Sequence, residues 1–159
     1  MASGPSEIIL LCAGLIVAGL VSGVLLDTWD DMDSAIDDRG KEGAEDVRTR
    51  ASLVNDPSNM PWDNTEKTAT VYIQNSGETF LSLETVGVYI DSSPLTVSVA
   101  DSSTSWIPGS IVQFTIDDTS DTLSYTGTND VIMTITVIST AQGYAGAHTV
   151  SEEVRLVTS

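Results

Sequence analysis

The chain opens with a long apolar run. Residues 8–26 (IILLCAGLIVAGLVSGVLL) contain no charged side chain. A helix over this run would be about 28 Å long, which is close to the hydrocarbon thickness of a bilayer. A cleaved secretory signal would instead have basic residues before the run and a small-x-small cleavage site after it. The leader MASGPSE has neither Lys nor Arg, and the run continues directly into DTWDDMD. We therefore predict a retained N-terminal helix in a membrane or a helical bundle.

Small residues recur along one side of this helix. The segment from Gly19 to Gly23 is a GxxxG motif, and Ala18 and Ser22 form a second small pair on the adjoining face. Small residues four positions apart let two helix backbones approach closely. We therefore predict that this face packs against another helix of the same or a different chain. The candidate packing residues are Gly14, Ala18, Gly19, Ser22 and Gly23.

An acidic segment follows, with nine acidic and four basic residues over positions 27–50. Its apolar residues recur at spacings of three and four, as on one face of a helix: Trp29, Met32 and Ile36. The pattern predicts that the helix continues beyond the membrane as a stalk until glycines at positions 40 and 43 weaken it. Residues 55–64 (NDPSNMPWDN) are expected to form an irregular linker.

From residue 66 onward the hydrophobic periodicity changes to two. Six β-branched runs, separated by turn residues, cover 69–75, 80–91, 95–100, 111–117, 131–139 and 147–157. This pattern is typical of an antiparallel β-sandwich of about 100 residues. The predicted fold is mainly β: an N-terminal hydrophobic helix followed by an immunoglobulin-like antiparallel β-sandwich. The predicted division is a helix at 1–26, a stalk and linker at 27–65, and the sandwich at 66–159.

The run VIMTITVIS at 131–139 carries no charge. A run of this kind is usually a core strand. If it lay instead at an exposed edge, its unpaired N–H and C=O groups would let a partner domain extend the sheet. Thr134 and Thr136 would then lie on the solvent side of a possible sandwich assembly strand.

Charge narrows the range of functions. The chain has 23 acidic and 6 basic residues, a formal net charge of −17. Such a chain repels polyphosphates, so a nucleic-acid partner is excluded. Four of the basic residues lie between Arg39 and Arg50, which leaves no basic patch elsewhere. The acidity suggests a high-salt habitat, where counterions screen the repulsion between carboxylates.

Candidate chemistry is sparse. One Cys and one His exclude an intrachain disulfide framework and a Cys/His zinc site. His148 has no Ser or Cys nearby in a nucleophile context, and the glycines form no phosphate loop. The acidic clusters at 30–33 and 117–121 lack the spaced ligands of a calcium loop and are interpreted as solvated surface. We expect no enzyme activity, no cofactor and no metal site.

The first 91 residues resemble a known family. The most specific stretches are VNDP at 54–57, YIQNSG at 72–77 and VYID at 88–91, after the uncharged leader and apolar helix. They are similar to archaeal flagellar protein G, a family of accessory components of the archaellum motor with a layout like that of type IV pilins. The resemblance implies a helix anchored in the cell membrane and a β-sandwich outside the cell, beneath the surface layer. It also implies assembly with itself and with the sister protein F as part of the stator.

A filament subunit, an archaellin or adhesion pilin, is the alternative, since it uses the same plan of helix and sandwich. Its helices would form a core bundle inside an extracellular filament. Prepilin processing requires a basic leader, and none precedes Glu7. Filament subunits are often glycosylated at Asn-x-Ser/Thr. None of the five asparagines begins this sequence: Asn55, Asn59, Asn64, Asn75 and Asn129. We expect the accessory motor component, with the filament subunit as the alternative.

Overall fold

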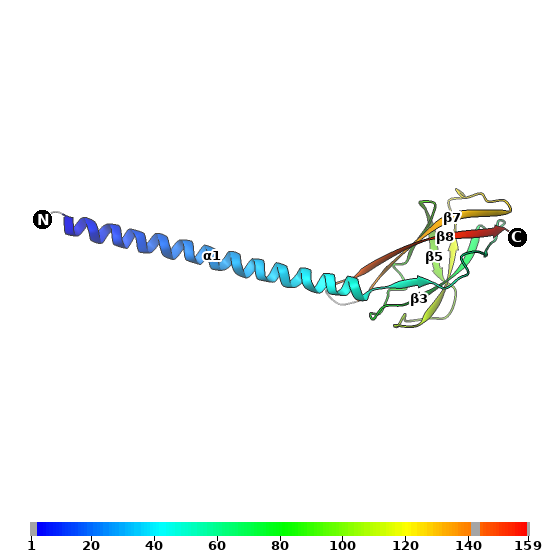
Figure 1. Ribbon diagram of the computed structural model, residues 1–159, viewed down its shortest axis with the longest axis horizontal. Coiled ribbons are helices and arrows are strands. Elements are labelled where there is room, and N and C mark those ends of the chain that lie inside the picture. The colour runs from blue at the N-terminus through cyan, green and yellow to red at the C-terminus, as the bar shows by residue number, and fades with distance from the viewer. Residues whose placement is uncertain (1–2, 141–143, 159) are drawn as a thin grey trace. The chain divides into compact units, whose positions relative to one another are not determined.

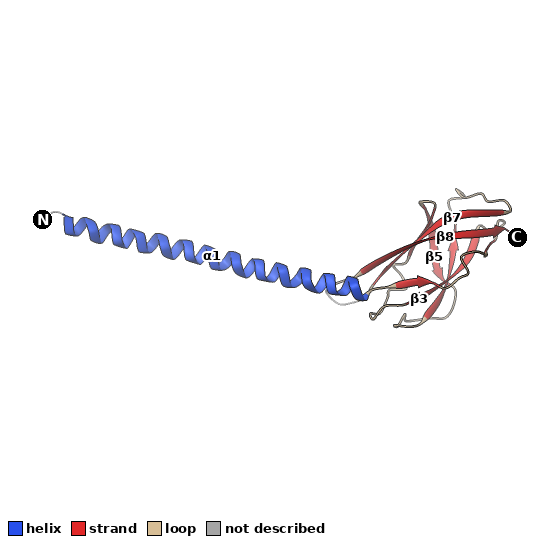
Figure 2. Cartoon of the chain, viewed as in Figure 1, coloured by secondary structure: helices blue, strands red, loops and turns tan. Residues whose placement is uncertain are grey.

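The computed structural model describes residues 3–140 and 144–158. One long helix precedes the strands (Figures 1 and 2). The elements are α1 (Ser3–Arg48), β1 (Ala51–Leu53), β2 (Met60–Trp62), β3 (Thr68–Asn75), β4 (Gly87–Ile90), β5 (Ser93–Val99), β6 (Ile111–Asp117), β7 (Thr128–Ile138) and β8 (Ala147–Thr158). The chain divides into two compact units, one ending at Lys41 and the other beginning at Glu42. The last turns of α1 therefore belong to the same unit as the strands.

Helix α1 combines the predicted apolar helix and the acidic stalk in one element. The large apolar side chains of residues 8–26 are 53–71% exposed, and this segment is long and apolar enough to cross a membrane. In the stalk, Asp37 and Lys41 form an ion pair of 2.7 Å one helical turn apart. The predicted weakening at Gly40 and Gly43 does not interrupt the helix, which continues to Arg48.

The strands form a curled sheet in the order β1-β3-β6-β5-β4-β7-β8-β2. Strand β5 belongs to both layers, because Ser93–Leu95 pairs with β4 and Thr96–Val99 pairs with β6. The sheet therefore folds over at β5, and the two layers enclose one core. Among the described residues, every strand pair is antiparallel except that of β2 with β8. The predicted fold class, a helix followed by a mainly β sandwich, is confirmed.

The core follows from the period-two pattern. Alternate residues of β3, β6 and β7 are buried, which places their β-branched and aromatic side chains between the layers. Two aromatic pairs pack in the core or, in the case of the partly buried Tyr125, against it. The ring centroids of Trp106 and Phe114 are 5.2 Å apart, and those of Trp62 and Tyr125 are 5.8 Å apart at an interplanar angle of 89°. Both pairs have the tilted or edge-on geometry that aromatic rings favour.

The predicted irregular linker at 55–64 is partly wrong. Residues 60–62 form β2, which pairs in parallel with the end of β8, and both Met60 and Trp62 are completely buried. A three-residue strand is too short to show a period, and Pro61 between the two apolar residues suggests a turn. Proline is tolerated here because β2 is an edge strand, where its missing N–H costs no ladder hydrogen bond.

The predicted strand at 80–91 is also shorter than expected. Only Gly87–Ile90 forms β4, and the preceding segment is held by isolated bridges from Leu81 to Trp106 and to Ser139. Alternation alone does not distinguish a paired strand from an extended segment that makes single bridges.

Candidate assembly surfaces

The predicted small-residue face of α1 is uncovered within the described part of the chain. A Cβ atom added at Gly14, Gly19 or Gly23 would meet no atom within 4 Å. Ala18 and Ser22 are exposed on the same helix. Close packing inside the chain therefore does not explain these small side chains. Packing of this face against a neighbouring helix remains a prediction.

Replacing Gly19 or Gly23 with Leu is expected to weaken association of the helices and to leave membrane insertion intact. Leucine fills the space through which a second backbone would approach, while it raises the hydrophobicity of the span. The matched control is Ala13→Leu, which enlarges a small residue on a different face. Oligomer size in detergent measures the effect, and an unchanged distribution for both glycine variants would contradict the prediction.

Strand β7 is not an edge strand, which agrees with a core strand and rules out the alternative of an assembly edge at Thr134 and Thr136. Thr134 lies opposite Tyr89 of β4 on one side and Ser151 of β8 on the other. The hydroxyl groups of Thr134 and Thr136 are also paired, with those of Ser151 at 2.9 Å and Thr149 at 3.0 Å. The backbone at Thr134 and Thr136 therefore has no free groups to offer a partner strand. Whether a charge-free strand is central or at an edge depends on long-range pairing, which its own composition does not encode.

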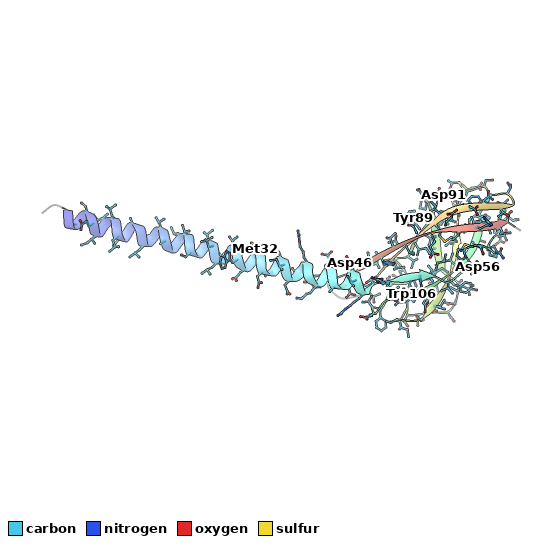
Figure 3. The ribbon with its side chains drawn as sticks, in the orientation of Figure 1. Met32, Asp46, Asp56, Tyr89, Asp91 and Trp106 are labelled. Atoms are coloured by element: carbon cyan, nitrogen blue, oxygen red, sulfur yellow. The ribbon has the colours of Figure 1, made fainter. Side chains whose placement is uncertain are left out.

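The end of α1 is fixed to the sandwich by two turns. The Glu78 N–H donates to the Arg48 carbonyl at 2.9 Å, and the Ala147 N–H donates to the Asp46 carboxylate at 2.8 Å. Both contacts lie within the unit that begins at Glu42, and Figure 3 labels Asp46 near the end of the helix. The fully buried Thr49 ends the helix, since its N–H and its hydroxyl both donate to the carbonyl of Glu45. These bonds satisfy carbonyls that a helix end leaves unpaired.

Glycine is required at both turns for steric reasons. A Cβ at Gly77 would overlap the Arg48 carbonyl oxygen and lie 2.7 Å from the Arg50 nitrogen. A Cβ at Gly146 would overlap the Thr49 hydroxyl and lie 2.6 Å from the Glu45 carbonyl oxygen. The two turns can approach the helix end only because these residues have no side chain.

The YIQNSG stretch at 72–77 contains a buried polar anchor. The side chain of Asn75 is fully buried, and its Nδ2 donates to the carbonyls of Thr79 at 2.7 Å and Trp106 at 3.2 Å. Its Oδ1 accepts the Gly77 N–H at 3.1 Å. The side-chain amide of Asn75 is thus the hydrogen-bond partner of two backbone carbonyls and one backbone N–H. This stretch positions the turn that holds the helix.

The VNDP stretch at 54–57 closes one edge of the sheet. The Asn55 side chain extends the ladder beside β3, since its Nδ2 donates to the Thr70 carbonyl at 2.9 Å and its Oδ1 accepts the Tyr72 N–H at 2.6 Å. Two residues later, the Pro57 carbonyl accepts the Arg155 N–H of β8 at 2.7 Å. The chain therefore crosses from one layer to the other within three residues.

The acidic cluster at 117–121 is organised by an internal cation. The Lys67 ammonium donates to the Leu123 carbonyl at 2.9 Å and lies 3.4 Å from the Asp121 carboxylate. The buried Asp118 carboxylate accepts the Leu123 N–H at 2.6 Å.

Burial of the Tyr125 side chain, together with the charges of Asp91 and Asp118, raises the pKa of Tyr125 to about 12. Among the described residues, no group of three His, Cys, Asp or Glu side chains is arranged to hold a metal ion.

An ion pair lies on the outer face of β7 and β8. The Arg155 guanidinium donates to both Asp130 carboxylate oxygens, at 2.7 and 3.1 Å. This hydrogen bonding lowers the pKa of Asp130. Ser58 similarly lowers the pKa of Asp56 by donating to its carboxylate from both its hydroxyl and its N–H. These contacts fix loops and strand ends.

An N-terminal apolar helix long enough for one membrane span, followed by a β-sandwich, defines the class of this chain by its layout. The sequence model of archaeal-type flagellins matches residues 2–156. The chain belongs to the archaeal-type flagellin family, whose members are structural rather than enzymatic.

A curated relative carries the name putative flagella-related protein G, from Methanococcus voltae. The chain is 27% identical to it over 95 residues, which are 58% of this chain and 63% of that protein. The match therefore spans less than two thirds of the relative's length. Together with the family match, it identifies an archaellum protein, which agrees with the resemblance found in the sequence.

Proposed function

We propose that this protein is a membrane-anchored accessory component of the archaellum and forms part of its stator. Helix α1 would hold the chain in the cell membrane, and the β-sandwich would lie outside the cell, beneath or at the surface layer. The accessory role draws on the resemblance to the protein G family, and the M. voltae relative carries the name putative flagella-related protein G. The alternative is a filament subunit, since the matching family is described as archaeal-type flagellin.

The observation that carries the proposal is the charge distribution along α1. Only residues 8–26 are continuously apolar, whereas residues 27–48 carry nine acidic and three basic side chains, a net charge of −6. At 100° per residue, the acids cover more than half of the helix circumference. A core bundle of many copies would bring these carboxylates together with too few bases to pair them, which is unfavourable. A single membrane span requires burial of residues 8–26 alone.

Mechanical shearing of cells separates the two functions. We expect the full chain to remain in the membrane fraction after external filaments have been sheared off and collected. The major filament subunits of the same cells are the matched control and should appear in the sheared fraction. Recovery of this chain as a stoichiometric component of the sheared filaments would overturn the accessory role and support the filament subunit.

The proposed partners are further copies of this chain, the sister archaellum protein F and the surface layer. Self-association is supported by the family, whose members assemble into filaments. Contact with protein F and the surface layer rests on the resemblance to protein G. Cross-linking in intact cells, followed by mass spectrometry of the adducts, tests both. Adducts of neither kind in motile cells would contradict these two partners.

Salt is expected to stabilise the β-sandwich. The chain has a net charge of −17, and screening removes repulsion among its carboxylates. Between 0.1 and 3 M KCl, the midpoint of thermal unfolding of the full chain in detergent should rise by about 5 °C or more. Screening is nearly complete at about 1 M, so most of the rise should occur below that concentration. Equal midpoints in the two buffers would reject the high-salt interpretation.

A further inference from the structure

Strand β8 has a partner strand along one entire side and along only a short part of the other side. Strand β7 accompanies it from Ala147 to Val157, and the two strands lie side by side in Figure 1. On the other side, β2 pairs only with residues 156–158. Within the described part of the chain, no strand pairs with residues 147–155 on that side.

The hydrogen bonds show which residues of β8 direct their backbone groups to the open side. The Thr158 N–H donates to the Gly127 carbonyl at 2.9 Å, and the Ser139 N–H donates to the Gly146 carbonyl at 2.8 Å. These two pairs lie at opposite ends of the antiparallel ladder between β7 and β8. Backbone groups alternate in direction along a strand, so the even-numbered residues of β8 face β7 and the odd-numbered residues face away.

Both ends of this outward edge are closed by the chain itself. At one end, the Ala147 N–H donates to the Asp46 carboxylate at 2.8 Å, and at the other end the Arg155 N–H donates to the Pro57 carbonyl at 2.7 Å. Three outward residues lie between these ends, and all three are exposed: Thr149, Ser151 and Glu153. They form what we call the open edge of β8.

We propose that the open edge of β8 pairs with the same edge of a second copy of this chain, antiparallel about a two-fold axis at Ser151. Ser151 would then lie opposite Ser151 of the second copy, and Thr149 opposite Glu153 of the second copy. The outward N–H and C=O groups of the three residues form six backbone hydrogen bonds across the axis. The pairing joins two sandwiches through one continuous sheet.

The open edge is complementary to itself in length and in charge. All three residues of the open edge can pair with the open edge of a second copy only when Ser151 lies opposite Ser151. If the register shifted by two residues, an open-edge residue would lie opposite a residue whose N–H is already bonded within its own chain. In the Ser151 register, Glu153 faces a neutral Thr149, and Glu152 faces Val150. No two carboxylates lie directly opposite, a juxtaposition that destabilises a strand pair.

The net charge of the β-sandwich region predicts how this pairing depends on salt. Residues 51–159 contain 13 acidic and two basic side chains, a net charge of −11. Two copies therefore repel each other at low ionic strength, and screening favours their association. A basic partner strand on the same edge would show the opposite dependence. The inference rests on the proposed function, because it names the surface through which an archaellum component would assemble with itself.

Disulfide cross-linking tests the geometry in the full chain. Hydrogen-bonded residues of an antiparallel pair have Cα atoms about 5.5 Å apart, which lies within disulfide range. In a Cys12→Ser background, Ser151→Cys should give a covalent dimer under mild oxidation in membranes. Thr149→Cys and Glu153→Cys chains should cross-link with each other when mixed. Ser98→Cys, exposed on β5, is the matched control; a Ser151→Cys yield no higher than this control would overturn the pairing.

A charge exchange tests the register. Thr149→Glu places two carboxylates opposite each other at both ends of the edge and should weaken dimerisation about tenfold, which corresponds to roughly 1.4 kcal/mol. Adding Glu153→Lys to the same chain creates opposite charges at these positions and should restore it. Ser98→Glu adds the same charge elsewhere and should leave association unchanged. Sedimentation in detergent at 0.5 M KCl measures dimerisation of the wild-type chain and of these three variants.

The outcomes separate the pairing from the proposed function. An unaffected Thr149→Glu chain, or a double variant no better than the single one, would overturn the pairing. Circular dichroism of each variant confirms that the β-sandwich is folded, and the cross-linking result applies independently of the charge variants. If cross-linking fails while the chain stays with the membrane after shearing, the pairing alone is wrong. Recovery of the chain in sheared filaments overturns the stator role instead.

Discussion

Replacing Trp62 with Ala is expected to cost roughly 3–5 kcal/mol of the free energy of unfolding, the range for large aromatic side chains deleted from a core. Trp62 is completely buried and packs edge-on against Tyr125. It is also part of β2, which closes the end of β8 through parallel pairing. The substitution would therefore leave a large cavity and weaken an edge of the sheet.

Chemical denaturation of the full chain in detergent, followed by the β-sheet circular dichroism signal, measures this cost. The matched control is Trp29→Ala, which removes the same side chain from a helix position that is 68% exposed. That variant should change sandwich stability by less than about 0.5 kcal/mol. Equal unfolding midpoints for the two variants would show that β2 does not contribute to the core.

Replacing Gly77 with Ala is expected to destabilise the sandwich by about 3 kcal/mol, because the added methyl group overlaps the Arg48 carbonyl oxygen. The neighbouring atoms are backbone, so they cannot rotate away as a flexible side chain would. The turn must instead withdraw from the helix end, which breaks the hydrogen bonds from Gly77 to Arg50 and from Glu78 to Arg48.

One measurement and one control variant distinguish this effect from a general loss of stability. Hydrogen exchange should show faster exchange at the end of α1 and in the turn at residues 76–78 than in β6 and β7. Gly87→Ala is the control, since its added Cβ would lie 3.5 Å from the Tyr89 ring, an ordinary contact. Wild-type protection at the helix end in the Gly77→Ala chain would contradict the steric account.

The candidate packing face of α1 and the turn at Gly77 differ in how far the sequence reveals them. The small residues of α1 form a pattern within one helix, so Gly14, Gly19 and Gly23 can be identified by spacing alone. The roles of Asn55 and Gly77 could not be derived in this way. Asn55 extends a ladder across 15 to 17 residues of sequence, and Gly77 is constrained by a helix end 29 residues before it. The family resemblance includes the stretches at 54–57 and 72–77, which contain these two residues, but it does not give their structural roles.

The apolar helix, the acidic stalk and the strand-rich second half can all be predicted from the amino-acid sequence. Each of these depends on local periodicity, which the backbone geometry of a helix or strand imposes on neighbouring residues. Runs such as 111–117 match the observed strand β6 residue for residue. The net charge can likewise be calculated from the composition without knowledge of the fold.

Which strands are central and which have an open edge is known from the three-dimensional pairing of the strands and not from their residues. Residues 131–138 of the charge-free run lie in the interior strand β7, which β4 and β8 flank, whereas the charged β8 has an open edge at Thr149, Ser151 and Glu153. The order of strands is fixed by pairing between distant segments and by the side chains that close each edge. A strand's own residues specify its faces but not its neighbours, because backbone N–H and C=O groups are the same at every position.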